Sequence, residues 1–245
     1  MDFSFMADTF VKLLAGAPLT VELAAISVAL GAVLALLLAL MRLSHVAVLD
    51  GIARSYLFVF RGTPLLVQIF LIYYGLGQFR PTLQELGLWG FFREPYWCAI
   101  LALTLNTAAY GGEIIRGGLQ SVPFPQLEAA RACGMSRALL FRRIVFPLAL
   151  RQALPAYGNE VILMVKATSL ASIITLMEVT GIAHKLISQT YRAVEIFVCA
   201  GAIYLILNFA VTRAVQALEW WLSPHLRGAP THEGPLPAPS LEQIH

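Results

Sequence analysis

Polar side chains interrupt the long apolar segment from about residue 154 to residue 176. Asn159, Glu160, Lys166, Thr168 and Ser169 all lie in it. A charged side chain at the centre of a membrane costs about 3 kcal/mol even on the milder scales, so such groups should face protein or a water-filled path. At about 100° per residue, Asn159 and Lys166 lie within roughly 20° of each other on a helix, two turns apart. The pattern favours a cavity that binds a small polar solute.

Two other apolar runs carry further candidate groups for such a cavity. Gln68 and Asn106 lie deep in their runs, whereas Glu113 stands one helical turn from Arg116 near the end of its run. A chamber of amides, hydroxyls and helix ends suits a small solute that carries both a positive and a negative charge. The predicted substrate path comprises Gln68, Asn106, Glu113, Asn159, Glu160, Lys166, Thr168 and Ser169.

The same residues also have a purely structural interpretation, which the sequence leaves open. Lys166 can pair with Glu160 or Glu113 and hold helices together, and Glu113 can form an ordinary exposed pair with Arg116. The hydroxyl of Ser169 and those of its neighbours can bond back to their own helix or pack between helices.

No catalytic constellation accompanies these polar groups. The five histidines are scattered, and Cys98, Cys133 and Cys199 lie far apart, with neither zinc spacing nor a disulfide pattern. The sequence holds no G-x-x-x-x-G-K-[ST] phosphate loop. We therefore predict that the chain is not an enzyme, with no catalytic residue, no metal site and no cofactor of its own.

The elements that position the polar groups must be membrane helices. Of 245 residues, 58% are hydrophobic and only 13% are charged, where soluble domains carry about 25% charged residues. A spanning helix needs roughly 20 mostly apolar residues. The prediction is an all-α integral membrane protein whose transmembrane domain covers residues 1–223. Its five spans are expected at about 19–41, 64–79, 96–115, 154–176 and 196–217.

The second expected span has a recognisable start. Thr63 is predicted to cap the helix, and Pro64 to occupy its first position, where the missing N–H costs nothing. Arg61, just before this start, is interpreted as a marker of the cytoplasmic end.

Positive residues set the predicted orientation. The first ten residues carry two aspartates and no Lys or Arg, unlike a cleavable signal peptide. With the N-terminus outside, eleven Lys and Arg residues fall inside and five fall outside, which is the bias of membrane proteins. The C-terminus is then cytoplasmic. Residues 224–245 are rich in Pro and poor in bulky apolar residues, which predicts a disordered cytoplasmic tail.

A polar, arginine-rich segment from about residue 120 to 150 separates the third and fourth spans. A short helix is expected over about 126–133, with Glu128 near its N-terminus, where the helix dipole favours a negative charge. Gly134 fits the left-handed position that ends a helix. Ser136 can cap a second helix that runs to about Val145, and Pro147 is then expected to break or bend the chain.

Six residues of this segment, Glu128, Ala129, Ala130, Gly134, Ile144 and Pro147, follow the spacing E-A-A, three residues, Gly, nine residues, I-x-x-P. This pattern closely resembles the cytoplasmic coupling loop of ABC importer permeases. Segments that begin at Arg61, Ala108 and Leu154 resemble the polar amino acid uptake subfamily, the permeases for histidine, glutamine and arginine. The resemblance covers about residues 10–220. Ala167 departs from it, because related chains often have a polar or acidic residue there, and this weakly disfavours a strictly basic substrate.

The resemblance implies a permease subunit in the bacterial cytoplasmic (inner) membrane. An extracytoplasmic binding protein would deliver the amino acid, docking near residues 80–95 and 181–192. The loop would fit a groove on separate ABC ATPase subunits, which bind ATP and Mg. A second permease chain, identical or similar, would complete the pore, with membrane lipid around it and no nucleic acid.

Two rival functions remain at this point. One is a secondary transporter or channel driven by an ion gradient, for which intramembrane Glu and Lys are suitable. The other is an ABC permease for another small polar solute. The E-A-A loop favours an ATP-driven system over a channel, because a channel has no use for it.

Overall fold

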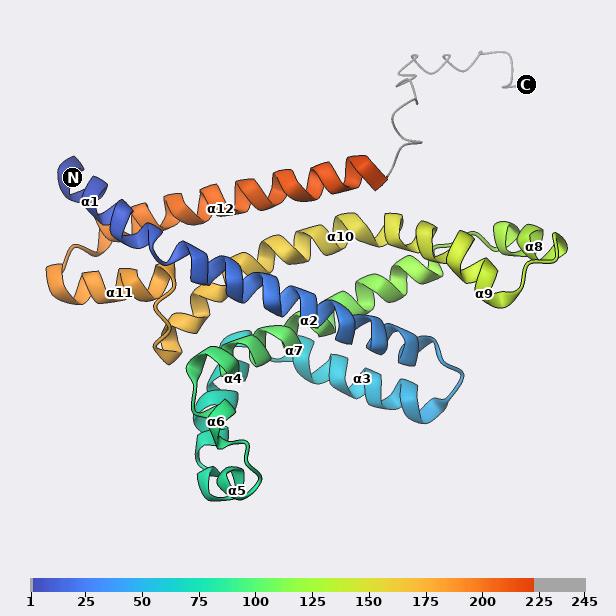
Figure 1. The fold of residues 1–245 in the computed structure, drawn as a ribbon, viewed down its shortest axis with the longest axis horizontal. Helices are drawn as coiled ribbons and strands as arrows, with labels where there is room; N and C mark the ends of the chain where they lie inside the picture. The colour runs from blue at the N-terminus through green and yellow to red at the C-terminus, as the bar shows by residue number, and fades with distance from the viewer. Residues whose placement is uncertain (1, 223–245) are drawn as a thin grey trace, which may run out of the picture.

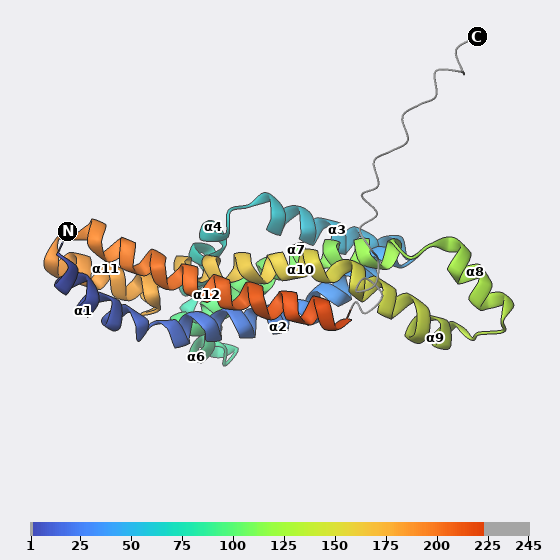
Figure 2. The ribbon, with the colours of Figure 1, turned by 90° about the horizontal axis from the view of Figure 1, so that it is seen from above.

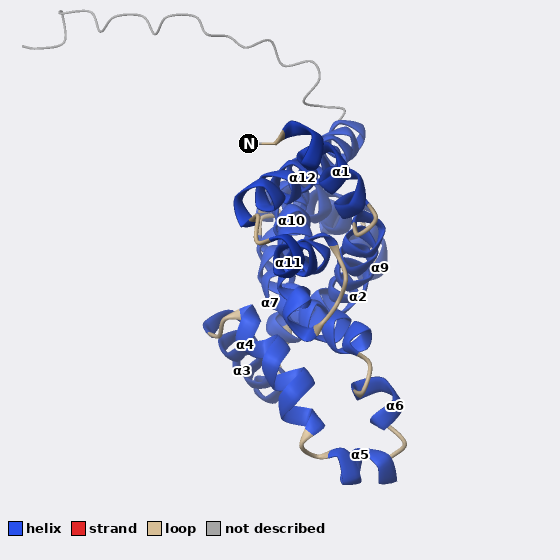
Figure 3. Ribbon diagram, turned by 90° about the vertical axis from the view of Figure 1, so that its left-hand side faces the viewer, coloured by secondary structure: helices blue, strands red, loops and turns tan. Residues whose placement is uncertain are grey.

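The structure is a computed structural model that describes residues 2–222, and all of their regular elements are helical (Figure 3). The expected tail at 224–245 lies outside the described residues. In chain order the elements are α1 (Phe3–Leu14), α2 (Ala17–Leu43), α3 (Ala47–Gly62), α4 (Leu65–Phe70), the π-helical turn η1 (Leu71–Gly75), α5 (Arg80–Glu85), α6 (Trp89–Phe92), α7 (Pro95–Gln120), α8 (Phe124–Ala132), α9 (Arg137–Leu140), the π-helical turn η2 (Phe141–Val145), α10 (Phe146–Ala167), the 3-10 helix η3 (Thr168–Ile174), α11 (Val179–Thr190) and α12 (Ala193–Leu222).

Three helical stretches are long and apolar enough to cross a membrane, namely Phe3–Leu43, Pro95–Gln120 and Ala193–Leu222. Two bent pairs pass the same test: α3 with α4–η1, and the stretch Arg137–Ile174 with α11. Counting each bent pair as one span gives up to five, the predicted number. The described part of the chain is therefore a multi-pass helical membrane protein.

The second expected span, 64–79, is not a straight helix. Its 6-residue α4 and 5-residue η1 together make 11 residues, about 16 Å of helix, too short to cross a hydrocarbon core of about 30 Å. Instead α4–η1 meets α3 at a bend of 104°. The predicted cap at Thr63 is also wrong: its hydroxyl donates to the Val59 carbonyl of α3 at 2.8 Å. Thr63 is extended, as a residue before proline prefers to be, so α3 ends there and the chain turns.

The most extensive helix–helix contact among the described residues lies between α2 and α7 (Figure 1). Small residues permit it. A Cβ placed on Gly31 of α2 would collide with the side chain of Thr107 on α7. Gly118 brings α7 equally close to α10, because a Cβ there would lie 2.7 Å from the Ala149 carbonyl oxygen. Membrane helices gain little from hydrophobic exclusion between one another, so close packing of this kind stabilises the bundle.

Three apolar clusters hold the helices together, and the smallest joins α2, α3 and α7 through Leu38, Ala53 and Ala108. Of the two larger clusters, one joins α2, α4, α7, α10 and η3 around Leu23, Ile69, Leu103 and Met164. The other joins α1, α11 and α12 around Leu13, Val179, Ile196 and Ile203. These clusters leave α8 and α9 projecting beyond the bundle, at the opposite end of the long axis from the N-terminus and α11 (Figure 2).

Asp2 ties the N-terminus to the turn between α11 and α12, at the same end of the long axis. It caps α1 by accepting hydrogen bonds from the Ser4 and Phe5 amides, both at 3.2 Å. Arg192, in the turn between α11 and α12, contacts it at 3.3 Å. The Ser4 hydroxyl, the Phe5 amide and Arg192 lower the pKa of Asp2 to about 2. The carboxylate therefore keeps its charge, and its contacts, across the physiological pH range.

Candidate functional site

Gly134 ends α8 in the conformation that the sequence predicts. Its φ is +75°, in the left-handed region. The Gly134 amide donates to the Arg131 carbonyl at 2.9 Å, and the Met135 amide donates to the Ala130 carbonyl at 3.2 Å. This pair of bonds is a Schellman motif, which satisfies carbonyls that the end of a helix otherwise leaves free. The backbone turn at the centre of the E-A-A segment is therefore fixed locally.

Ser136 caps the second helix, as predicted, by accepting from the Leu139 amide at 3.4 Å. The expected break at Pro147 is absent. The helix continues through η2, where the Phe146 amide bonds to the Phe141 carbonyl five residues back. A π-type turn of this kind lets the helix absorb Pro147, which sits in the first turn of α10, where its missing N–H is tolerated. The segment 137–174 consequently runs without a break from the loop into the membrane domain.

A hollow of about 490 Å³ lies between α8 and the start of α10. Four of the six residues in the E-A-A pattern line it: Ala129, Ala130, Ile144 and Pro147. We call it the coupling hollow. Arg143 and Arg151 also line it, so an apolar floor is flanked by positive charge. Such a surface fits a partner that presents an apolar side chain beside acidic groups.

The other two residues of the pattern lie outside this hollow. Gly134 shapes the turn behind it. Glu128 is exposed in the second turn of α8 rather than the first, because α8 begins at Phe124 with Pro125 in its first turn. The expected stabilisation of Glu128 by the start of the helix dipole is therefore lost, since that effect fades within the first turn.

Gln68 and Asn106, both predicted path residues, are buried and meet each other. The Asn106 amide donates to Gln68 Oε1 at 3.1 Å. The Gln68 amide in turn donates to the carbonyls of Phe60 and Thr63, at 2.9 and 3.1 Å. These carbonyls belong to the end of α3, where the chain bends toward α4. The pair therefore holds that bend against α7.

Glu160 is also buried, and its Oε1 accepts from the Thr107 hydroxyl of α7 at 3.2 Å. Thr168 and Ser169 bond back to their own chain, to the Val165 carbonyl at 2.8 Å and to the Lys166 carbonyl at 2.7 Å. These two hydroxyls therefore make the bonds to their own helix that the purely structural interpretation expects. Spacing alone could not distinguish these roles, because the partners lie on other helices or on the helix backbone.

Asn159 and Lys166 are exposed on α10. Within residues 2–222 neither side chain makes a hydrogen bond or an ion pair, so the alternative pairing of Lys166 with Glu160 or Glu113 is not formed. They are the members of the predicted path whose polar atoms are free to meet a solute.

Glu113 belongs to a network of charges where α2, α3 and α7 meet. It contacts Arg116 at 2.6 Å and Arg42 at 3.4 Å. Asp50 contacts Arg42 and Arg54, each at 2.7 Å. The expected pair of Glu113 with Arg116 is thus formed, but as part of a half-buried cluster rather than an exposed pair. The sequence signal for it was the clustering of arginines near the ends of three apolar runs.

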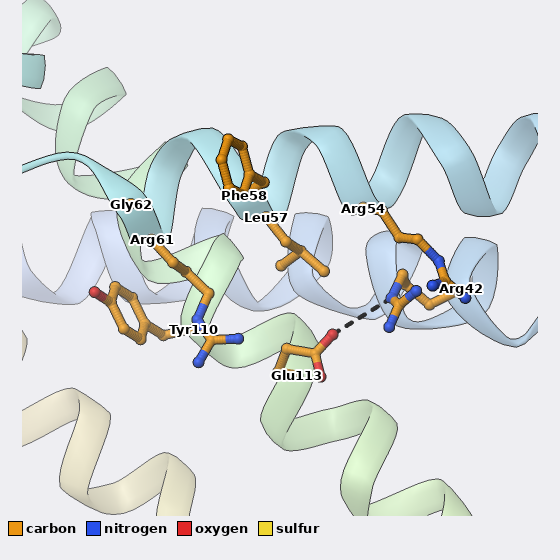
Figure 4. A pocket seen from close by; sticks show the side chains of 8 residues that line it. All are labelled: Arg42, Arg54, Leu57, Phe58, Arg61, Gly62, Tyr110 and Glu113. Carbon is orange, nitrogen blue, oxygen red and sulfur yellow. Dashed lines mark hydrogen bonds and ion pairs between the residues drawn. The ribbon is translucent and has the colours of Figure 1, made fainter.

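This network borders a second hollow, of about 500 Å³, which sequence reasoning missed (Figure 4). Arg42, Arg54, Arg61, Tyr110 and Glu113 contribute its polar lining, and Leu57 and Phe58 its apolar lining. We call it the arginine hollow. The residues that form it are separated by up to 71 positions in the sequence, so no local pattern could reveal it.

Comparison with known proteins decides the family. A profile of the family described as "Binding-protein-dependent transport system inner membrane component" matches residues 28–223. The chain belongs to this family. The prediction of an all-α ABC importer permease is confirmed with it, and the chain is a transport component rather than an enzyme.

Two relatives and one solved structure are informative. The chain is 60% identical to the nopaline transport system permease protein NocM of Agrobacterium fabrum, over 93% of this chain and 94% of that one. It is 64% identical to the octopine transport system permease protein OccM of Rhizobium meliloti, over 91% of each. A crystal structure of an amino acid ABC transporter with histidines matches with a TM-score of 0.79 and 36% identity, covering 89% of this chain and 98% of that one.

Proposed function

We propose that this chain is the permease subunit of a bacterial ABC importer for amino acids, and that its solute is an opine of the nopaline or octopine kind. The identity of 60–64% to permeases for these two solutes, over more than nine tenths of the chain, supports the substrate class. The exposed amide of Asn159 and ammonium of Lys166 offer polar groups to such a solute within the membrane domain.

The observation that carries the mechanism is the unbroken stretch from Arg137 to Ile174. It begins beside the coupling hollow and ends at η3, which packs against α2, α4 and α7. A partner seated in the hollow can therefore move α10 as a lever. Separate ATPase subunits would supply that motion, with ATP and Mg bound on their side, and closure of two such subunits would switch the access of the path.

The remaining partners follow from the same proposal. A second permease chain would line the other side of the path, and an extracytoplasmic binding protein would deliver the solute to the end that holds α1 and α11. The N-terminus would then lie outside, and α8 and α9 in the cytoplasm. The two ends of the long axis carry these elements, as this arrangement requires (Figure 2).

Reconstitution tests the proposal. The chain would be assembled in proteoliposomes with its ATPase and permease partners, and uptake of labelled octopine, nopaline and histidine would be measured with the binding protein present. We expect uptake only with ATP, and a preference for the opines. Uptake driven by an ion gradient without ATP would support a secondary transporter instead, and ATP-driven uptake of a different solute alone would refute the substrate class.

A further inference from the structure

Arg61 differs from the other cations of the arginine hollow in having no carboxylate partner. Arg42 and Arg54 share Asp50, and Arg42 also reaches Glu113. Within residues 2–222, the guanidinium of Arg61 has one described contact, with the ring of Tyr110 on α7, 5.4 Å from the ring centroid. Its hydrogen-bond donors are therefore available to a ligand.

The position of Arg61 on α3 bears on what such a ligand could be. Arg61 lies 14 residues after the start of α3, which is about 21 Å along the helix axis from the turn that joins α2 to α3. Arg61 therefore stands next to the 104° bend at which α3 meets α4–η1, in a bent pair that is long and apolar enough to form one span. Ionisable residues in spanning segments usually face a partner or a water-filled path, and the Arg61 side chain is exposed rather than packed inside the bundle.

The hollow is shaped for an anion with an apolar body. Figure 4 shows the Arg61 guanidinium directed from α3 toward Tyr110 and Glu113 on α7. The carboxylates of Asp50 and Glu113 are occupied by Arg42, Arg54 and Arg116, which leaves an excess of positive charge. Leu57 lines the same space with an apolar side chain. A guanidinium binds a carboxylate through two parallel hydrogen bonds, which a neutral group cannot reproduce.

We propose that Arg61 binds a carboxylate of the transported solute in the arginine hollow. The inference rests on the proposed function, since it takes the solute to be an amino acid or an opine. Tyr110 holds the guanidinium in place while the site is empty, and the carboxylate takes over its N–H groups when the solute arrives. Arg61 then selects solutes by charge inside the membrane domain, independently of the binding protein outside.

Direct binding to the assembled transporter in nanodiscs, without the binding protein, tests this assignment. The probes are octopine and its methyl-esterified form, and histidine and its decarboxylated form, histamine. In the wild type we expect each probe with a free carboxylate to bind at least about tenfold more tightly than its counterpart without one. Arg61→Gln should abolish this difference in affinity, because it weakens the binding of the two carboxylate probes alone. Arg61→Lys should restore part of the difference. Arg213→Gln is the matched control, because Arg213 also stacks on an aromatic ring, at 5.0 Å, but lies on α12 away from the hollow.

The outcomes separate this inference from the proposed function. ATP-driven uptake by the wild type, combined with an unchanged carboxylate preference in Arg61→Gln, overturns the inference and leaves the function standing. Absence of both uptake and binding for every probe overturns both. A lipid phosphate is the other anion that fits an arginine. If mass spectrometry finds that Arg61→Gln loses a co-purifying anionic lipid while its solute preference is unchanged, the hollow is a lipid site and the inference is wrong.

Discussion

Asn106 and Gln68 share a hydrogen bond although they stand 38 residues apart. At the scale of single residues, the sequence singled out both as candidates for lining a substrate path, and the structure buries them against each other. It could not tell that each is the other's partner, because that depends on the bend after Thr63. Lys166 is the opposite case. Its structural interpretation required an ion pair with Glu160 or Glu113, but Glu160 accepts a hydrogen bond from Thr107 and Glu113 pairs with two arginines.

The buried pair gives a stability prediction. Asn106→Leu should destabilise the protein by about 1–3 kcal/mol, because it leaves Gln68 Oε1 buried without a donor. Thermal unfolding in detergent would measure this as a lower Tm. Asn159→Leu is the matched control for stability, since Asn159 is exposed and makes no hydrogen bond within the described residues. Equal Tm values for the two variants would show that the bond does not hold the α3–α4 bend.

At the scale of elements, the long helices were predictable and their interruptions were not. The expected spans at 19–41, 96–115 and 196–217 lie within α2, α7 and α12, because apolar runs of that length specify a membrane helix. The 104° bend between α3 and α4 was hidden, although Thr63-Pro64 contains its local cause, since the angle is set by packing on α7. Pro147 was likewise predicted to break the helix, because the sequence does not reveal the π-helical turn η2 that precedes it.

The Schellman turn at Gly134 gives a prediction about coupling. Gly134→Val should disfavour the left-handed conformation at this position by about 1–2 kcal/mol. The turn would then change, and α8 would move away from its place as one wall of the coupling hollow. We expect ATP-driven uptake to fall severely while the protein still inserts in the membrane. Uptake in proteoliposomes and the amount of membrane-inserted protein would be measured together. Gly117→Val is the control, because Gly117 lies within α7 with open space around it and an ordinary helical conformation. Full uptake by Gly134→Val would refute this account of the turn.

At the scale of the whole molecule, the distribution of arginines and the shape of the bundle both bear on how the chain is oriented in the membrane. The prediction of an outside N-terminus rests on eleven positive residues against five, and it requires the N-terminus and the E-A-A segment to lie on opposite sides. The structure places them at opposite ends of its long axis (Figure 2).

The native cysteines allow the orientation to be tested without adding a label. Cys133, just past the end of α8, is exposed, whereas Cys98 and Cys199 are buried. A membrane-impermeant maleimide should therefore react with inside-out vesicles and leave intact spheroplasts unmodified, and Cys133→Ser should abolish the reaction. Because Cys133 also lines the coupling hollow, a bound ATPase should protect it, and labelling should rise when the ATPase is stripped away. Reaction of Cys133 in intact spheroplasts would show that the orientation is the reverse of the predicted one. Labelling that does not change when the ATPase is removed would show that the ATPase docks elsewhere.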